Sequence, residues 1–126
     1  MKLPRLDAWV AGRRRVAARY REAFADLPAR LQRETDGGHA YHLFTVRTDD
    51  RDALARHLGA RGIETATHYP VPLHLQPVFA GLGLGPGAFP ESERAAAAVL
   101  SLPIYAEISD AQVDRVIDGV RSHFGR

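Results

Sequence analysis

Four side chains that form hydrogen bonds lie within nine residues of one another, in a stretch rich in proline. They are His68, Tyr69, His74 and Gln76. Two imidazoles, a phenol and a carboxamide can donate and accept hydrogen bonds, and an imidazole also exchanges a proton near neutral pH. Pro70, Pro72 and Pro77 fix φ and lack an amide hydrogen, so neither a helix nor a central strand continues through them. The sequence therefore predicts a stiff, extended binding loop at residues 68–77.

Each of these polar side chains also has a structural alternative. His68, at the end of a β-favouring run, can bond a backbone carbonyl group, Tyr69 can pack beneath the loop, and Gln76 can cap the turn before Pro77. A general-base role for His68 or His74 is chemically feasible as well, because an imidazole titrates near neutrality. The residue types alone leave binding, structural and proton-transfer roles open.

Three other patterns look functional but have simpler interpretations. His39 and His42 lack nearby carboxylate or thiolate partners, and strand spacing directs them to opposite faces, so we predict no metal site. Successive helical residues point about 100° apart, so Arg13–Arg15 do not converge on one anion. The glycines of 81–87 alternate with other residues after a proline loop and include Pro86, which favours a surface loop over a phosphate cradle.

Composition limits the number of domains and the kinds of partner. The chain has 126 residues, 45% of them hydrophobic, which suits a single domain over residues 1–126. A formal net charge of +2 predicts no nucleic-acid surface. The absence of cysteine fits a reducing compartment. No apolar run is long enough for a membrane span and the N-terminus lacks a signal-peptide core, so we expect a cytoplasmic protein without membrane contact.

Hydrophobic periodicity and capping residues predict the elements that position the loop. Helices are expected over residues 6–27, from 49 or 50 to 61, from 90 to 99 or 100, and from the capping box at Ser109 to just before Gly125. Strands are expected over residues 41–46, 63–68 and 100–104, with Pro103 marking the last as an edge or a strand end. Gly62 is the expected stop of the second helix. This order predicts a small two-layer α/β sandwich, with a short antiparallel or mixed sheet packed with helices.

The proline-rich run also carries a family resemblance. His68-Tyr69-Pro70-Val71-Pro72-Leu73-His74-Leu75-Gln76-Pro77 resembles a loop in the small, C-terminal domain of the DegT/StrS class of sugar-nucleotide aminotransferases, which are pyridoxal-phosphate enzymes of fold type I. Further segments resemble other parts of that domain in the same order: Leu3 to Trp9, Arg14-Arg15 with Ala18 and Tyr20, Arg51 to Leu54, Arg61 to Ile63, and Leu100 to Pro103. The resemblance covers nearly the whole chain, but only the last third or so of a family member.

The resemblance implies an activity for the complete enzyme and assigns the cofactor chemistry to a domain other than this one. The complete enzyme would use pyridoxal phosphate to move an amino group from an amino-acid donor to a nucleotide-linked keto-sugar, in amino-sugar biosynthesis. In the family a large domain supplies the Schiff-base lysine, the aspartate facing the pyridine nitrogen and most phosphate contacts, and none of those motifs occurs here. Lys2, near the terminus, is the chain's only lysine. The resemblance therefore predicts no covalently bound cofactor and no catalytic residue on this chain, and assigns His68, Tyr69, His74 and Gln76 to substrate binding.

Two functions remain open at this point. In the first, the chain is a C-terminal domain or fragment of the aminotransferase that is inactive alone and has a large domain, or a further copy of itself, as partner. In the second, it is a stand-alone binding or regulatory module that retains the fold. In the first case Trp9, Leu73 and Leu75 are the apolar side chains expected to be exposed when the partner is missing. Whether the chain is itself an enzyme, and which sugar and amino donor it serves, does not follow from these residues.

Overall fold

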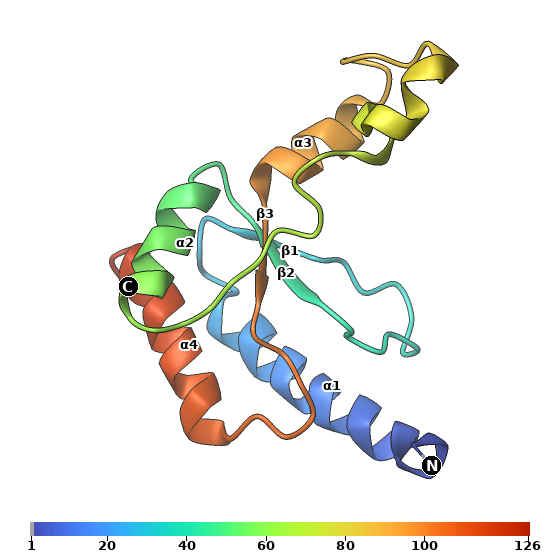
Figure 1. Cartoon of the computed structure of the whole chain (residues 1–126). Helices are drawn as coiled ribbons and strands as arrows, with labels where there is room; N and C mark the ends of the chain where they lie inside the picture. The colour runs from blue at the N-terminus through green and yellow to red at the C-terminus, as the bar shows by residue number, and fades with distance from the viewer. Residues whose placement is uncertain (1) are drawn as a thin grey trace.

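Alternating helices and strands build one core in the computed structural model, which describes residues 2–126 (Figure 1). The helices and strands are α1 (Leu6–Ala23), β1 (Arg30–Leu31), β2 (Phe44–Arg47), α2 (Arg51–Ala60), α3 (Pro90–Ala98), β3 (Val99–Leu102) and α4 (Asp110–His123), with short 3-10 turns at Leu3–Arg5, Leu73–Leu75 and Pro77–Leu82. Three antiparallel strands in the order β1-β2-β3 form the sheet. The predicted small α/β fold with a short sheet is confirmed.

The core lies where α1, α2 and α4 meet the central strand. Phe44 and Val46 of β2 are buried and pair in register with Leu102 and Leu100 of β3. Tyr20 of α1 packs its ring edge-on against Phe44 at 5.1 Å. Alternate residues of β2 thus carry the apolar face, as expected for a strand covered by helices on one side.

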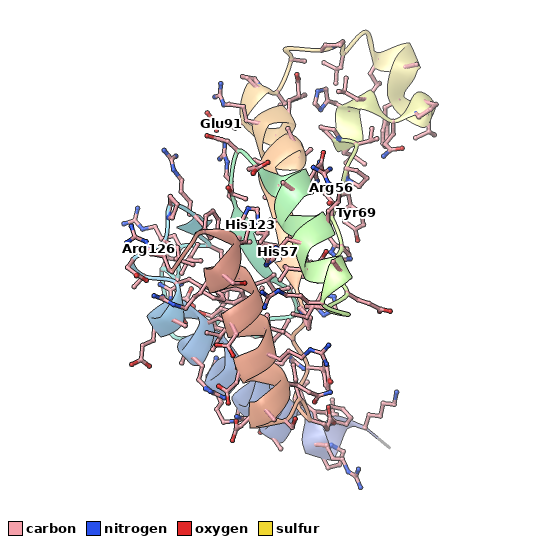
Figure 2. All side chains as sticks on the ribbon, turned by 90° about the vertical axis from the view of Figure 1, so that its left-hand side faces the viewer. Arg56, His57, Tyr69, Glu91, His123 and Arg126 are labelled. Carbon is pink, nitrogen blue, oxygen red and sulfur yellow. The ribbon has the colours of Figure 1, made fainter. Side chains whose placement is uncertain are left out.

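Helices α2 and α4 pack closely against each other through a glycine. A Cβ atom at Gly119 of α4 would lie 2.9 Å from both Leu58 and Ile63. Beside this contact, Figure 2 shows His57 of α2 and His123 of α4 as neighbours, with ring centroids 5.4 Å apart. The small residue leaves room for the terminal methyl groups of the buried Leu58 and Ile63 side chains.

Helix α3 and the loop before it form an arm that projects from this body (Figure 1). Ala96 and Ala98 are buried, whereas every residue from Gly81 to Glu91 is exposed. The prolines and the alanine-rich helix give the arm little apolar side-chain volume for the main core. The arm therefore stands beside the sheet rather than over it.

The predicted strand at residues 63–68 is wrong in its extent. Only Ala66 pairs with Ser101 of β3, through backbone bonds of 3.3 and 2.7 Å. The neighbouring residues Thr67 and His68 bond to side chains instead, and Pro70 and Pro72 supply no amide hydrogens for a longer ladder. The segment is extended but contributes a single bridge to the sheet.

Other boundaries differ by a few residues. Helix α1 ends at Ala23, four residues before the predicted end. The prediction runs too far because Leu27 reaches the core from the turn after the helix and so prolongs the apolar pattern. Strand β2 begins at Phe44, after Tyr41 with its positive φ of 47°. The two-residue strand β1 lies in a stretch that the sequence predicts as a turn-rich connection, because so short a strand carries no periodicity.

The predicted caps at the ends of two helices are confirmed. Ser109 and Gln112 form both hydrogen bonds of a capping box at the start of α4. Gly62 has a φ of 69°, the left-handed geometry that a glycine after a helix end supplies without strain. Asp50 occupies the cap position of α2, but its side chain does not bond the helix. Within residues 2–126, no helix combines the length and apolar character needed to cross a bilayer.

Candidate functional site

An open groove of about 580 Å³ lies between the proline-rich loop and α3. Its walls come from the loop and from α3, and the central strand contributes Thr45. The lining residues are Thr45, His68, Tyr69, Val71, Pro72, Leu73, Gln76, Ser92, Ala95, Ala96 and Val99. The alanines of α3 leave room that larger side chains would fill. The result is a mostly apolar groove with a few polar groups, the usual composition of a small-molecule site.

His68 stands where the chain leaves its bridge to β3 and enters the loop. Its Nδ1 lies 2.9 Å from the hydroxyl oxygen of Ser101. The peptide bond between His68 and Tyr69 is cis, and the two rings meet edge to face with centroids 5.5 Å apart. The ring is held by the strand while it lines the groove.

Tyr69 and Gln76 complete the polar part of the loop wall. Tyr69 is 73% exposed, and within residues 2–126 its hydroxyl has no hydrogen-bond partner. The Gln76 side-chain nitrogen donates to the carbonyl oxygen of Val71 at 3.2 Å, which closes the loop on itself. The carboxamide oxygen of Gln76 keeps its accepting capacity. Three of the four predicted site residues therefore line one groove.

His74 is placed differently. Its side chain is buried, its Nε2 lies 3.0 Å from a carboxylate oxygen of Glu93, and its ring packs on Phe89 with centroids 4.9 Å apart. It lines a second hollow, of about 330 Å³, on the far side of Leu73. The structure does not bring His74 together with His68, Tyr69 and Gln76.

Glu93 ties the loop to the start of α3. Besides His74, it accepts hydrogen bonds from the backbone nitrogens of Gly87, at 2.8 and 3.0 Å, and of Phe89, at 3.4 Å. The Gly87 amide lowers the pKa of Glu93 most; burial opposes this shift, and His74 and Phe89 add to it. The carboxylate is therefore the form that holds these segments together.

Three residues that support the site were not predicted: Ser101, Glu93 and Arg51. Arg51 donates to the hydroxyl oxygen of Thr67 at 2.7 Å and reaches the first carbonyl of β3 at 3.4 Å. Ser101 and Arg51 lie within segments that resemble the family, and this resemblance was the sequence signal that could have identified them. Glu93 gave no such signal, because acidic residues are common in the first turn of a helix. Their partners lie 16 to 33 residues away in the chain.

The groove residues do not by themselves fit pyridoxal phosphate. None of the lining residues is a lysine that forms a Schiff base or an arginine that pairs with a phosphate. Lys2 is exposed beside the first 3-10 turn. No step of a reaction is therefore assigned to that cofactor on this chain. Residues 2–126 also contain no group of three or more His, Asp or Glu side chains arranged to hold a metal ion.

Comparison with known proteins agrees with the geometry of the fold. A model of the DegT/DnrJ/EryC1/StrS aminotransferase family matches residues 1–121. The chain is 47% identical over 123 residues to dTDP-3-amino-3,4,6-trideoxy-alpha-D-glucose transaminase of Streptomyces venezuelae, an alignment that covers 96% of this chain and 32% of that protein. It is 42% identical over 129 residues to the Pleiotropic regulatory protein of Geobacillus stearothermophilus, covering 98% and 34%.

A solved structure shows the same fold over nearly all of this chain. The crystal structure of DesV from S. venezuelae matches with a TM-score of 0.95 and 46% identity, covering 99% of this chain and 34% of that one. The chain thus spans about a third of the length of the curated relatives it matches. On the family match over residues 1–121 and this likeness of fold, the chain belongs to the DegT/DnrJ/EryC1/StrS aminotransferase family.

Proposed function

We propose that residues 1–126 act as the C-terminal, substrate-side domain of an aminotransferase for nucleotide-linked keto-sugars. One observation carries this proposal. The likeness to the S. venezuelae structure covers 99% of this chain but 34% of that one, while the groove of this chain has no amine. A larger domain would supply the lysine, the pyridoxal phosphate and the opposite wall of the site. The complete enzyme would then transfer an amino group from an amino-acid donor to the sugar.

The polar residues of the groove take the substrate-side role. His68, Tyr69 and Gln76 present a ring nitrogen, a hydroxyl and a carboxamide oxygen along one wall. A hydroxylated sugar or a diphosphate offers matching acceptors and donors. His74 contributes by holding the loop through Glu93, so its effect on the substrate is indirect. The prolines reduce the entropy lost when a ligand orders the loop.

The exposed apolar side chains of the arm support a partner surface. Leu73 is 72% exposed, and Val78, Leu82 and Phe89 are exposed nearby. Trp9 and Leu75, expected to be exposed, are half-buried instead. Leu73, Leu82 and Phe89 also line one hollow, and clustered exposed apolar side chains are typical of a face covered by another domain or copy. We propose that a large domain covers it in the complete enzyme, and that the isolated chain self-associates through it.

A complementation assay tests the proposal. The chain is mixed with the separately expressed large domain of the S. venezuelae transaminase, pyridoxal phosphate, an amino donor and a dTDP-linked keto-sugar. We expect no turnover from either part alone and measurable amino-sugar formation from the mixture. The same large domain with its own last third is the positive control. Turnover by this chain alone, or no turnover from the mixture while the control is active, contradicts the proposal.

A non-catalytic module is the second candidate. It is favoured by one observation, the 42% identity to a protein named for regulation, over nearly all of this chain. In that case the chain would bind a nucleotide sugar or a partner protein without any aminotransferase domain. Binding of dTDP-glucose by the chain alone, together with failure to complement the large domain, would favour this function over the first.

A further inference from the structure

The segment that enters the proline-rich loop is held at three successive residues, two of them bonded to β3 and one to Arg51 of α2. Ala66 forms the backbone bridge with Ser101, Thr67 bonds the guanidinium group of Arg51, and His68 bonds the side chain of Ser101. Arg51 also reaches the carbonyl oxygen of the first residue of β3. Ser101 therefore holds both the backbone before the loop and the first polar ring of the groove.

The direction of the Ser101–His68 hydrogen bond follows from burial. Ser101 is 5% exposed, so its hydroxyl hydrogen cannot be given to bulk water at low cost. In the described part of the chain, Nδ1 of His68 is the acceptor that this hydroxyl reaches, at 2.9 Å. The opposite direction, from Nδ1–H to the serine oxygen, would leave the hydroxyl hydrogen without a partner. Burial of Ser101 therefore favours the serine hydroxyl as the donor and Nδ1 as the acceptor.

This direction determines the tautomer of His68. A neutral imidazole carries one hydrogen, and a ring that accepts at Nδ1 carries it on Nε2. Within residues 2–126, Nε2 of His68 has no hydrogen-bond partner. His68 lines the groove and also a smaller hollow of about 230 Å³ that Ser101 shares. The free polar atom of this ring is therefore a donor.

We propose that Ser101 is a positioning residue that holds His68 in the Nε2–H tautomer and orients it as a hydrogen-bond donor to an oxygen of the bound sugar nucleotide. The tautomer depends only on the fold of this chain. The contact with a ligand oxygen rests on the proposed function. A phosphate oxygen and a sugar oxygen share this accepting chemistry, and the ligand measurements below distinguish them.

The tautomer is measured on the 126-residue chain by long-range proton–nitrogen NMR of its histidine rings, above the ordinary imidazole pKa. The His68→Gln variant identifies the His68 signals. We expect wild-type His68 to show a protonated Nε2 and an unprotonated Nδ1. Ser101→Ala should lose this single pattern and give two exchanging tautomers, and Ser101→Thr, which keeps the hydroxyl, should restore it. A protonated Nδ1 in the wild type, or an unchanged pattern in Ser101→Ala, overturns the proposal.

The chain offers a matched control for this experiment. Ser122 lies 3.0 Å from Nε2 of His57 in a second serine–histidine pair, far from the groove. Ser122→Ala should leave the His68 signals unchanged, and a change there would show that the His68 pattern reports general loosening. The wild-type spectrum decides the tautomer even if a variant folds poorly.

Turnover and ligand binding test the second step. In the complemented enzyme, Ser101→Ala should raise KM for the sugar nucleotide about 2- to 13-fold with kcat little changed, the loss of one oriented hydrogen bond. The second measurement adds dTDP or dTDP-glucose to the chain and follows the NMR signal of His68 Nε2. If a phosphate oxygen is the acceptor, both ligands should shift this signal. If a sugar oxygen is the acceptor, only dTDP-glucose should shift it. An effect confined to kcat, or no shift with either ligand, overturns this step. Failed complementation counts against the proposed function and leaves the tautomer result standing.

Discussion

At the scale of single residues, the two histidines of the proline-rich loop have different surroundings. His68 lines the groove, and one of its ring nitrogens has no hydrogen-bond partner among residues 2–126, whereas His74 is buried against Glu93 and Phe89. An imidazole with a free polar atom is available to a ligand, and one that is enclosed mainly supports the loop. The same residue type thus has two different environments in one short loop.

Replacing His68 by alanine should weaken sugar-nucleotide binding in the complemented enzyme. A lost hydrogen bond of about 0.5–1.5 kcal/mol raises KM roughly 2- to 13-fold, and a bond to a charged phosphate of up to about 3 kcal/mol raises it roughly 150-fold. The half-reaction with the amino donor should stay nearly intact, because the proposed function places this wall on the sugar side of the site. Steady-state and single-half-reaction kinetics measure both. His57→Ala, outside the groove, is the control; loss of the donor half-reaction in His68→Ala would contradict the assignment.

Glu93 gives the loop a pH-dependent attachment. The pKa of Glu93 is lowered in the folded chain, first by the Gly87 amide and also by His74. The Glu93 carboxylate therefore stabilises the fold fully above the pKa that it has in the unfolded chain. This stabilisation is lost as the pH falls through the lower pKa of the folded chain. We expect Glu93→Gln to melt below wild type near neutral pH, with the difference shrinking below about pH 4. Thermal unfolding as a function of pH measures this. The control is Glu107→Gln, at an exposed position, whose melting temperature should not approach that of the wild type as the pH falls. If the melting temperatures of Glu93→Gln and the wild type differ by the same amount at every pH, the role of the Glu93 charge is refuted.

At the scale of elements, tertiary packing decides what a helical glycine does. A Cβ atom at Gly119 of α4 would meet buried Leu58 and Ile63, while one at exposed Gly59 of α2 would meet no atom within 4 Å. Alanine is the better helix former by about 0.8–1.0 kcal/mol in a helix interior, so propensity favours the substitution at both positions. Only at Gly119 does a close neighbour oppose it.

The two glycines therefore form a paired test. Gly119→Ala should destabilise the chain by about 1–3 kcal/mol through overpacking, because the side chains it meets are held in the core. Gly59→Ala should stabilise it by about 0.5–1 kcal/mol. Chemical denaturation of both variants with the wild type measures the free energies of unfolding. A Gly119→Ala variant as stable as the wild type would show that α2 and α4 separate more easily than this packing implies.

At the scale of the whole molecule, three features bear on the proposed function. The groove is open, the apolar arm is exposed, and the chain's single lysine lies outside the groove. Each feature agrees with a domain that works against a larger partner. The proposed complex would bury the arm and close the groove together.

We expect the isolated chain to form no stoichiometric aldimine with pyridoxal phosphate. Lys2 is exposed, so no surrounding pocket encloses its amine or holds the cofactor phosphate. Incubation with pyridoxal phosphate, reduction with borohydride and peptide mapping by mass spectrometry give the site and extent of labelling. The complemented large domain should be labelled under the same conditions. Specific, complete labelling of Lys2 together with turnover would contradict the proposal that a separate large domain supplies the Schiff-base lysine.

The sequence predicts an extended loop at residues 68–77, but a 3-10 turn at Leu73–Leu75 interrupts it. The sequence by itself determined other local features: the helices, their caps at Ser109 and Gly62 and, through its resemblance, the family. These depend on interactions between residues a few positions apart, where residue type largely decides conformation. Only the tertiary structure decided that residues 63–68 form a single bridge, that His68 lines the groove while His74 is buried, and that Ser101 and Glu93 hold them. The two histidine contacts join residues 33 and 19 positions apart, and no local pattern states which distant side chain will fill a given hydrogen bond.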